Sequence, residues 1–282
     1  MSPALRRAAL MAPGLGWLAL FLLVPCLIVF ATSFFERGVY GGIDYVFTFE
    51  NYRRAVEPLY RSILLNSAWL ALLATLLAAL IGYPAAYAIA KAPARRQPAL
   101  LVLVMLPYWS NYLIRTYAWI VLLNREGLIN RTLALLGVTE PLPLLYNDFA
   151  IVLGLVYGYL PFMVLAIYAS LNRLDPTLLE QSADLGASAV STFLRITLPL
   201  TLPGFAAGSV FVFVLSIGNF ITPDLLGGGQ RLMVGNLIYK QFLSARDWPF
   251  GAALAFLLIA LMMALLFIQA LLVRRGGGER PA

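Results

Sequence analysis

The stretch Glu180–Pro199 reads EQSADLGASAVSTFLRITLP and lies between two long apolar segments. Asp175 and Pro176 come shortly before it. An aspartate followed by proline indicates a helix start, because the carboxylate caps free backbone N–H groups and proline suits the first helical position. Gly186 then favours a left-handed residue, which ends a helix at little steric cost. The stretch therefore predicts a short helix that stops or bends at Gly186.

A second short helix is expected after the glycine. It should run from Ser188 to Ile196, and Pro199 and Pro203 are expected to end it, since proline removes a backbone donor. Residues 176–196, called the elbow below, would then form a helix–glycine–helix segment between two membrane spans. An ordinary polar loop with a turn glycine is the competing interpretation.

The composition indicates a polytopic membrane protein. Of the 282 residues, 61% are hydrophobic and 12% are charged, whereas soluble domains carry about 25% charged residues. The formal net charge is +7. The arginines of the chain are scattered between apolar spans, as expected for loops that face anionic lipid. They do not gather on one face, which disfavours a nucleic-acid partner.

Missing residue types exclude several kinds of chemistry. The sequence has no histidine and one cysteine, Cys26, so it cannot form a Ser-His-Asp triad, an internal disulfide or a zinc site of cysteine and histidine. Neither Lys91 nor Lys240 follows a glycine, which excludes a phosphate-binding P-loop. We predict no catalytic residue, no metal ligand and no cofactor in this chain. If ATP drives it, another subunit binds ATP and Mg²⁺.

The hydrophobic pattern predicts an all-α membrane protein that forms a single transmembrane domain with six spans. Each expected span is long enough to cross a bilayer. A cleaved signal peptide is the competing interpretation of the first span. The expected bounds are about 14–34, 63–90, 99–123, 149–171, 204–222 and 250–273, with a coupling loop at 172–203 between spans four and five.

Six spans put both termini and the elbow on one side of the membrane. Dense basic pairs stand beside span ends on that side, at Arg6–Arg7, Arg95–Arg96 and Arg274–Arg275. Short basic segments next to spans face the cytoplasm under the positive-inside rule. Both termini are therefore expected to be cytoplasmic.

Polar and aromatic residues gather inside the expected third span. If 99–123 is one helix, Tyr108, Asn111 and Arg115 share a side, and Trp109 lies in the same polar run. Arginine at the bilayer centre costs about 2.5–3.5 kcal/mol, so Arg115 is expected to face protein, water or a carboxylate. This face is predicted to line a substrate path. An outer aromatic belt with a snorkelling arginine is the competing interpretation.

Three further residues are candidates for the same path. Tyr157 lies in span four near Pro161, and proline there frees a carbonyl that a water-filled cavity can satisfy. Asn219 is a polar residue within the apolar fifth span, and Asp224 follows at its membrane edge.

The elbow resembles the EAA loop of ABC-importer permeases. That pattern is Glu-Ala-Ala, three residues, Gly, nine residues and Ile-x-Leu-Pro, and this chain follows the spacing, with Gln181 and Ser182 in place of the alanines. The resemblance implies a type I importer permease of the bacterial inner (plasma) membrane, with a cytoplasmic coupling helix between spans four and five that docks into an ATPase. The implied coupling residues are Glu180, Ser182, Asp184, Gly186, Ile196 and Pro199.

Nearly the whole chain after residue 50 is similar to the first permease subunit of spermidine/putrescine importers. The similar segments include LPYWSNYLIRTYAW (106–119), PDLLGG (223–228) and ARDWPFGAA (245–253). This similarity implies a heterodimer with a second homologous permease subunit. It also implies a cytoplasmic ATPase dimer, an extracytoplasmic solute-binding protein and polyamine transport.

The residues leave the substrate open. A polyamine path should offer aromatic faces and carboxylates to ammonium groups. The aromatic residues are present, but Asp148 and Asp224 stand only at span ends and Asn219 is neutral. An amino-acid derivative or an opine is therefore the alternative solute. An ATP-independent channel or secondary transporter is a more remote alternative, disfavoured by the absence of histidine and of acids within the spans.

Overall fold

A computed structural model describes residues 3–138, 140–229 and 231–276, with side chains described between 11 and 271. The basic pairs Arg6–Arg7 and Arg274–Arg275 lie outside that side-chain range. The chain forms two compact units. Unit 1 is Met1–Ser62 with Leu237–Ala260, and unit 2 is Ile63–Asn236 with Leu261–Ala282.

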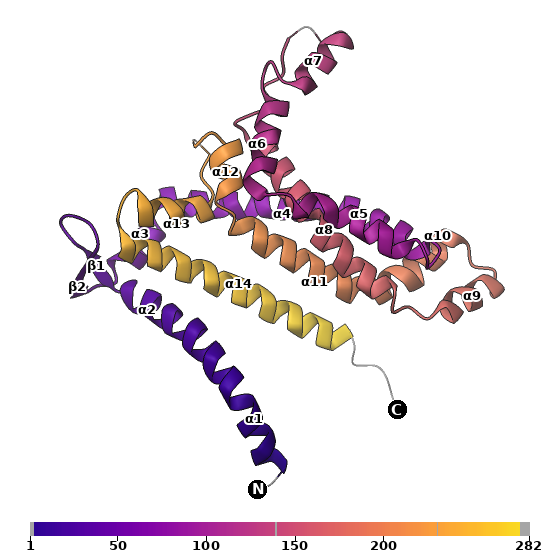
Figure 1. The fold of residues 1–282 in the computed structure, drawn as a ribbon, viewed down its shortest axis with the longest axis horizontal. Coiled ribbons are helices and arrows are strands. Elements are labelled where there is room, and N and C mark those ends of the chain that lie inside the picture. The colour runs from indigo at the N-terminus through magenta and orange to yellow at the C-terminus, as the bar shows by residue number, and fades with distance from the viewer. Residues whose placement is uncertain (1–2, 139, 230, 277–282) are drawn as a thin grey trace. The chain divides into compact units, whose positions relative to one another are not determined.

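Unit 1 begins with a long apolar helical run and continues into a β-hairpin (Figure 1). Two strands pair antiparallel, with Arg37 opposite Ile43. The expectation of an all-α protein is therefore wrong at this segment. The second strand, IDYVF, is rich in β-branched and aromatic residues, which favour an extended backbone. The elements are α1 Pro3–Leu18, the π-helical turn η1 Ala19–Leu23, α2 Val24–Thr32, β1 Phe35–Arg37, β2 Ile43–Phe47 and α3 Glu50–Ala55.

A buried ion pair joins the two sequence segments of unit 1. Arg54 donates to the Asp247 carboxylate at 3.0 Å, and its guanidinium lies 4.1 Å from the Phe250 ring centre. Asp247 also accepts from the backbone N–H of Phe250. Burial opposes the charge of Arg54, but the hydrogen bond and charge of Asp247 outweigh burial and raise the pKa of Arg54.

Unit 2 holds most of the helices. Three helices have residues in both units: α4, α13 and α14. Most residues of α4 and α14 belong to unit 2. The bounds are α4 Pro58–Lys91, α5 Gln97–Trp109, α6 Tyr112–Leu123, α7 Leu128–Leu135, α8 Asp148–Leu171, α9 Pro176–Asp184, α10 Ala189–Thr192, the π-helical turn η2 Phe193–Thr197, α11 Leu198–Ile217, α12 Ile221–Leu226, α13 Val234–Leu243 and α14 Trp248–Gly276.

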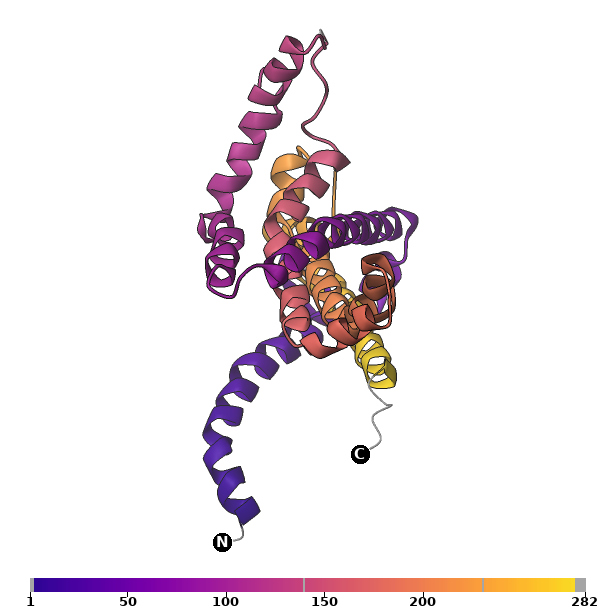
Figure 2. The same cartoon turned by 90° about the vertical axis from the view of Figure 1, so that its right-hand side faces the viewer.

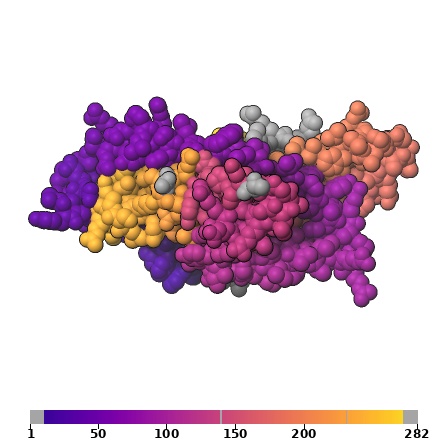
Figure 3. Space-filling model, turned by 90° about the horizontal axis from the view of Figure 1, so that it is seen from above, coloured from indigo at the N-terminus to yellow at the C-terminus, as the bar shows by residue number. Residues whose placement is uncertain are grey.

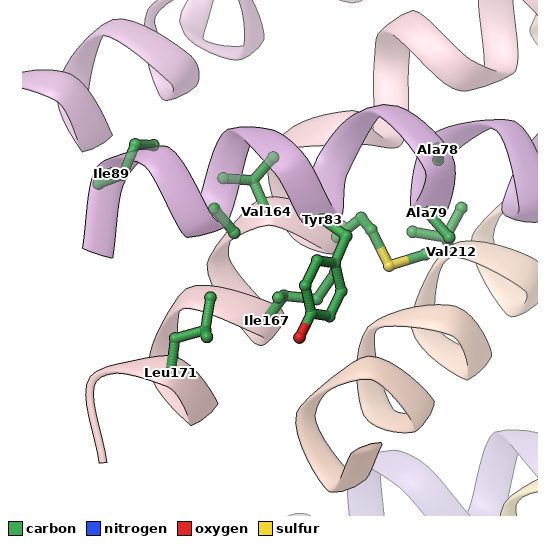
Figure 4. Close-up of a cluster of buried hydrophobic side chains, with 10 residues drawn as sticks. Ala78, Ala79, Tyr83, Ile89, Val164, Ile167, Leu171 and Val212 are labelled. Atoms are coloured by element: carbon green, nitrogen blue, oxygen red, sulfur yellow. The ribbon is translucent and has the colours of Figure 1, made fainter. Parts of the chain in front are cut away.

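The core of unit 2 lies between α4, α8 and α11 (Figure 4). Small residues let these helices approach closely, as is usual for helices in membranes. Ala78 and Ala86 on α4 are fully buried. At Gly204 on α11, an added Cβ atom would lie 2.4 Å from the Cβ of Ser170 on α8. The α8–α11 contact therefore depends on the absence of a side chain at Gly204.

Five helices among the described residues are long and apolar enough to cross a membrane: Met11–Thr32, Pro58–Lys91, Asp148–Leu171, Ala189–Ile217 and Trp248–Leu271. The expected third span is not one helix, because the backbone is extended at Ser110 and α6 starts afresh after Asn111. The Asn111 side chain caps α6 by accepting from the N–H groups of Leu113 and Ile114. Beyond α6, the chain continues into the short helix α7, which lies away from α8 and α11 (Figure 2).

The prolines expected to end the elbow's second helix do not end it. The chain is helical without a break from Ala189 to Ile217, through Pro199 and Pro203. Pro199 stands two residues after the end of a π-helical turn, a wider turn that is often found where a helix is kinked. The Thr201 hydroxyl also donates to the carbonyls of Thr197 and Leu198.

Candidate functional site

A cluster of hydrogen-bonded side chains joins four segments at the α6–α12 end of unit 2. The Nδ2 atom of Asn219 donates to the hydroxyls of Tyr112 on α6 and Tyr159 on α8, each at 2.6 Å. Its Oδ1 atom accepts from the backbone N–H of Thr222 on α12 at 2.9 Å. The hydroxyls of Tyr112 and Thr222 share a further hydrogen bond. We call Tyr112, Tyr159, Asn219 and Thr222 the polar cluster.

Asn219 is 8% exposed, and its amide is used almost fully within the chain. The Tyr159 hydroxyl accepts from Asn219 and keeps its own proton for another acceptor. A hollow of about 370 Å³ opens beside the cluster, lined by Tyr112, Tyr159, Val214, Leu215, Gly218, Asn219, Phe220 and Ile221. These lining residues include no charged side chain. The hollow therefore suits a solute or solute segment with apolar surface and a few hydrogen-bonding groups.

Arg115 lies among three tyrosine rings. Its guanidinium carbon is 5.2 Å from the Tyr112 ring centre, 5.7 Å from that of Tyr108 and 5.9 Å from that of Tyr157. These distances are within the ~6 Å range of cation–π attraction. Its Nη1 atom donates at 2.7 Å to the carbonyl of Pro107, where α5 is about to end. Arg115 thus satisfies a backbone carbonyl near the break between α5 and α6, and its guanidinium faces protein.

The other residues of the predicted path fall into different surroundings. Tyr108 and Tyr157 join the cluster around Arg115 and contact Phe162 and Trp119, respectively. Trp109 is exposed. Asn111 caps α6, so the single face that a continuous helix would have formed does not exist. Asp224 lines a separate hollow with Tyr117 and Tyr146.

The elbow has the start and the turn that the sequence predicts. Asp175 accepts from the backbone N–H of Thr177 at 3.0 Å, and this hydrogen bond lowers the pKa of Asp175. Gly186 has a φ of 77°, which L residues other than glycine adopt at a cost. The Ser182 hydroxyl is buried and bonds to the Thr192 hydroxyl at 2.7 Å. Ser182 therefore links the two helices of the elbow across the glycine.

The rest of the elbow is turned outward. Glu180 and Asp184 are exposed, Ile196 is half-buried in the π-helical turn, and Pro199, three residues beyond the elbow, is exposed. Leu185, beside the glycine, is 88% exposed, and Val190 is also exposed. The elbow therefore presents apolar and acidic side chains around a glycine that has open space next to it.

Thr222 and Tyr146 are site residues that the sequence did not single out. Thr222 bonds within the polar cluster through both its N–H and its hydroxyl, but a threonine at a span end carries no distinctive signal. Tyr146 has a φ of 62°, and its Leu-Tyr-Asn context gives no warning of a left-handed residue.

Comparisons with known proteins agree on the family. The model of the family described as "Binding-protein-dependent transport system inner membrane component" matches residues 78–276. The spermidine/putrescine transport system permease protein PotB of Escherichia coli (strain K12) is 44% identical over 254 residues, covering 90% of this chain and 92% of that protein. PotB of Haemophilus influenzae is 42% identical, with 90% and 89% covered.

A solved structure shows the same fold. The chain matches a bacterial alginate ABC transporter, in complex with its alginate pentasaccharide-bound periplasmic protein, with a TM-score of 0.76 and 18% identity over 96% of each chain. Family membership makes this chain a multi-pass inner-membrane transport component and not an enzyme. The chain belongs to the family of binding-protein-dependent transport system inner membrane components.

Proposed function

We propose that this chain is a permease subunit of an ATP-driven importer for polyamines such as spermidine and putrescine. The observation that carries the proposal is the 44% identity to a spermidine/putrescine permease protein over 90% of the chain. The solute would pass beside the polar cluster, where aromatic rings surround the hollow. Aromatic faces suit the methylene chain and the ammonium groups of a polyamine.

The α5–α6 pair completes six crossings in this proposal. Helix α5 has 13 residues, or about 20 Å at 1.5 Å per residue, which is too short for a ~30 Å hydrocarbon core. The Pro107 carbonyl near the break accepts from Arg115 and Ser110. An interrupted helix of this kind is tolerated where it is buried in protein or lines a water-filled cavity.

The elbow would face the cytoplasm. Tyr87 and Lys91 at the end of α4 line one hollow with Pro176 and Leu179 of the elbow, so the basic connection 91–96 lies at the elbow's end of unit 2. Short basic connections face the cytoplasm under the positive-inside rule. With six crossings, both termini would then be cytoplasmic as well.

The elbow would act as the coupling helix. Its exposed Leu185 and acidic Glu180 suit docking into a groove of a cytoplasmic ATPase dimer, which would bind ATP and Mg²⁺. A second homologous permease subunit and an extracytoplasmic solute-binding protein would complete the complex. The solved relative in complex with a periplasmic protein supports the last of these partners.

The mechanism would be alternating access driven by movement of the elbow. The helix from Ala189 to Ile217 joins the elbow at one end and leads directly to Asn219 at the other. Closure of the ATPases would move this rigid element and so change the polar cluster. The chain's own part is to transmit this motion and to shape the path, with no covalent step.

Substitutions at Gly186 test the coupling role. A Cβ atom there would meet nothing within 4 Å in this chain, so any added side chain would project toward a docked partner. Asparagine tolerates a positive φ and valine does not. We expect Gly186→Asn to insert normally yet lose most solute-stimulated ATPase activity and uptake, and Gly186→Val to lose at least as much. Wild-type coupling in both variants would contradict the coupling role.

An uncharged or zwitterionic solute is the second candidate. The observation in its favour is the hollow beside Asn219, whose lining residues include no acid. ATPase activity of the assembled complex should be assayed with spermidine, putrescine, and amino-acid derivatives including opines, each with the binding protein. Stimulation by the polyamines alone supports the first candidate, and stimulation by another solute alone supports the second.

A further inference from the structure

A second hollow, separate from the one beside Asn219, lies at the same end of unit 2. It has a volume of about 680 Å³ and is lined by Tyr117, Ile120, Tyr146, Asp224, Leu225 and Gly228. Helix α12 contributes to both hollows, because Ile221 lines the first and Asp224 the second. Figure 3 looks onto this end of unit 2, with the segment around α7 toward the viewer.

The chemistry of this hollow differs from that of the first. Its lining includes one charged side chain, Asp224, together with the rings of Tyr117 and Tyr146, each more than half exposed. A carboxylate is costly against lipid, so this hollow is expected to face water or protein. Asp224 also interacts within the chain, but a carboxylate offers about four acceptor sites and can accept from a ligand as well.

Tyr146 is held against this hollow in a costly backbone conformation. Its φ of 62° lies in the left-handed region, which is uncommon for a bulky residue and clusters at functional sites. Its backbone N–H donates at 3.0 Å to the carbonyl of Leu226 at the end of α12. Its ring lies so close to Gly228 that an added Cβ atom there would be 2.7 Å from the ring. These contacts fix the ring beside the loop that follows Asp224.

We propose that Asp224, Tyr117 and Tyr146 form an ammonium-binding subsite where the solute enters the permease. The carboxylate would accept charge-assisted hydrogen bonds from a primary ammonium group, and the two rings would offer their faces to the same cation. The neutral hollow beside Asn219 would receive the solute next. This assignment rests on the proposed polyamine function and supplies the carboxylate that the spans lack.

The test uses the assembled complex in proteoliposomes, with saturating solute-binding protein loaded with spermidine. The quantity measured is spermidine taken up per ATP hydrolysed. Asp224→Asn should lower this ratio about 10-fold or more, because a hydrogen bond to a charged group is lost. Binding-protein-stimulated ATP hydrolysis should persist, since the elbow is untouched. A purely structural role for Asp224 would lower uptake and hydrolysis together.

Two variants at Tyr146 separate the ring from the fold. Tyr146→Gly removes the ring and also relieves the positive φ, so it should fold normally and lower the ratio about 3-fold. Tyr146→Phe keeps the aromatic face, so it should lower the ratio clearly less than Tyr146→Gly does. Matched controls are Asp44→Asn and Tyr40→Ala, at exposed positions of the hairpin segment in unit 1. Both controls should leave the ratio unchanged.

The outcomes distinguish this assignment from the proposed function. A wild-type complex that takes up no polyamine overturns both. If the wild-type complex takes up spermidine and the Asp224→Asn complex has the same ratio of uptake to ATP hydrolysis, only the ammonium subsite is overturned. A parallel loss of uptake and ATP hydrolysis in Asp224→Asn also overturns it.

Discussion

At the scale of single residues, Asn219 shows how a neutral side chain holds the polar cluster together. Its amide donates to two tyrosine hydroxyls and accepts from the Thr222 backbone. An aspartate here could only accept, so both tyrosines would have to reverse their hydrogen bonds. The asparagine therefore fixes the rings of Tyr112 and Tyr159 without adding charge to the hollow.

Replacing Asn219 by alanine should destabilise unit 2. The hydroxyls of the half-buried Tyr112 and Tyr159 would lose the donor Asn219, at a cost of about 1–3 kcal/mol. We expect a lower melting temperature of the purified protein in detergent. Asn172→Ala, at an exposed position after α8, is the matched control and should melt as the wild type does. An unchanged melting temperature in Asn219→Ala would show that the polar cluster contributes nothing to stability.

Asp247 offers a second test at the residue scale. Its carboxylate is buried beside Arg54, and removing one partner of a buried ion pair costs about 3–5 kcal/mol. Because the Arg54 side chain is 32% exposed, we expect Asp247→Ala to cost about 2–3 kcal/mol. Thermal unfolding in detergent measures this difference.

The matched control for Asp247 is Glu50→Ala. Glu50 and Arg53 form an exposed pair at 3.8 Å, and exposed pairs contribute about 0–1 kcal/mol. If Asp247→Ala and Glu50→Ala lower the stability equally, burial does not make the Arg54–Asp247 pair more stabilising than an exposed pair.

The misplacement of Asn111 also belongs to the residue scale. Its position on a path face assumed that 99–123 is one helix. Ser-Asn followed by an apolar run is a helix-start signal, because asparagine is a preferred N-cap, and the structure shows that cap. The sequence carries this signal, but the length of the expected span 99–123 favours one membrane-crossing helix.

At the scale of elements, the close contact between α8 and α11 links the elbow to the polar cluster. Gly204→Ala would bring a Cβ atom to 2.7 Å from the carbonyl oxygen of Ala166 and closer still to Ser170. Overpacking of this kind costs about 1–3 kcal/mol, although alanine is the better helix former by about 1 kcal/mol. We expect a lower melting temperature and weaker coupling between ATP hydrolysis and uptake.

Gly16→Ala provides the comparison for Gly204→Ala. A Cβ atom at Gly16 would meet nothing within 4 Å, so helix propensity alone should act and the variant should be as stable as the wild type or slightly more so. If the two substitutions have the same effect, close packing at Gly204 is not needed.

The positions of proline predict only some of the helix ends in this chain. Pro176 opens α9 as predicted, whereas Pro199 and Pro203 lie inside a continuous helical run. The helix instead widens into a π-helical turn over Phe193–Thr197, just before Pro199. This turn does not follow from the apolar pattern alone, because it depends on the three-dimensional course of the helix.

At the scale of the whole molecule, composition and apolar run lengths predicted the membrane class, and the EAA spacing predicted the family. Hydropathy succeeds at this level because the bilayer imposes one length scale on every span. Two of the hydrogen bonds in the polar cluster, Tyr112–Asn219 and Tyr112–Thr222, join residues more than 100 positions apart. Such pairings depend on how α6, α8 and α12 meet, which a single sequence does not encode in any local pattern.

The most direct test of the central claim is uptake of radiolabelled spermidine into proteoliposomes. The complex would contain this chain, the second permease subunit, the ATPase and the solute-binding protein. We predict uptake that requires ATP and the binding protein, and no uptake by this chain reconstituted alone. ATP-independent uptake by the chain alone, or an assembled complex that hydrolyses ATP without accumulating spermidine or putrescine, would contradict the account.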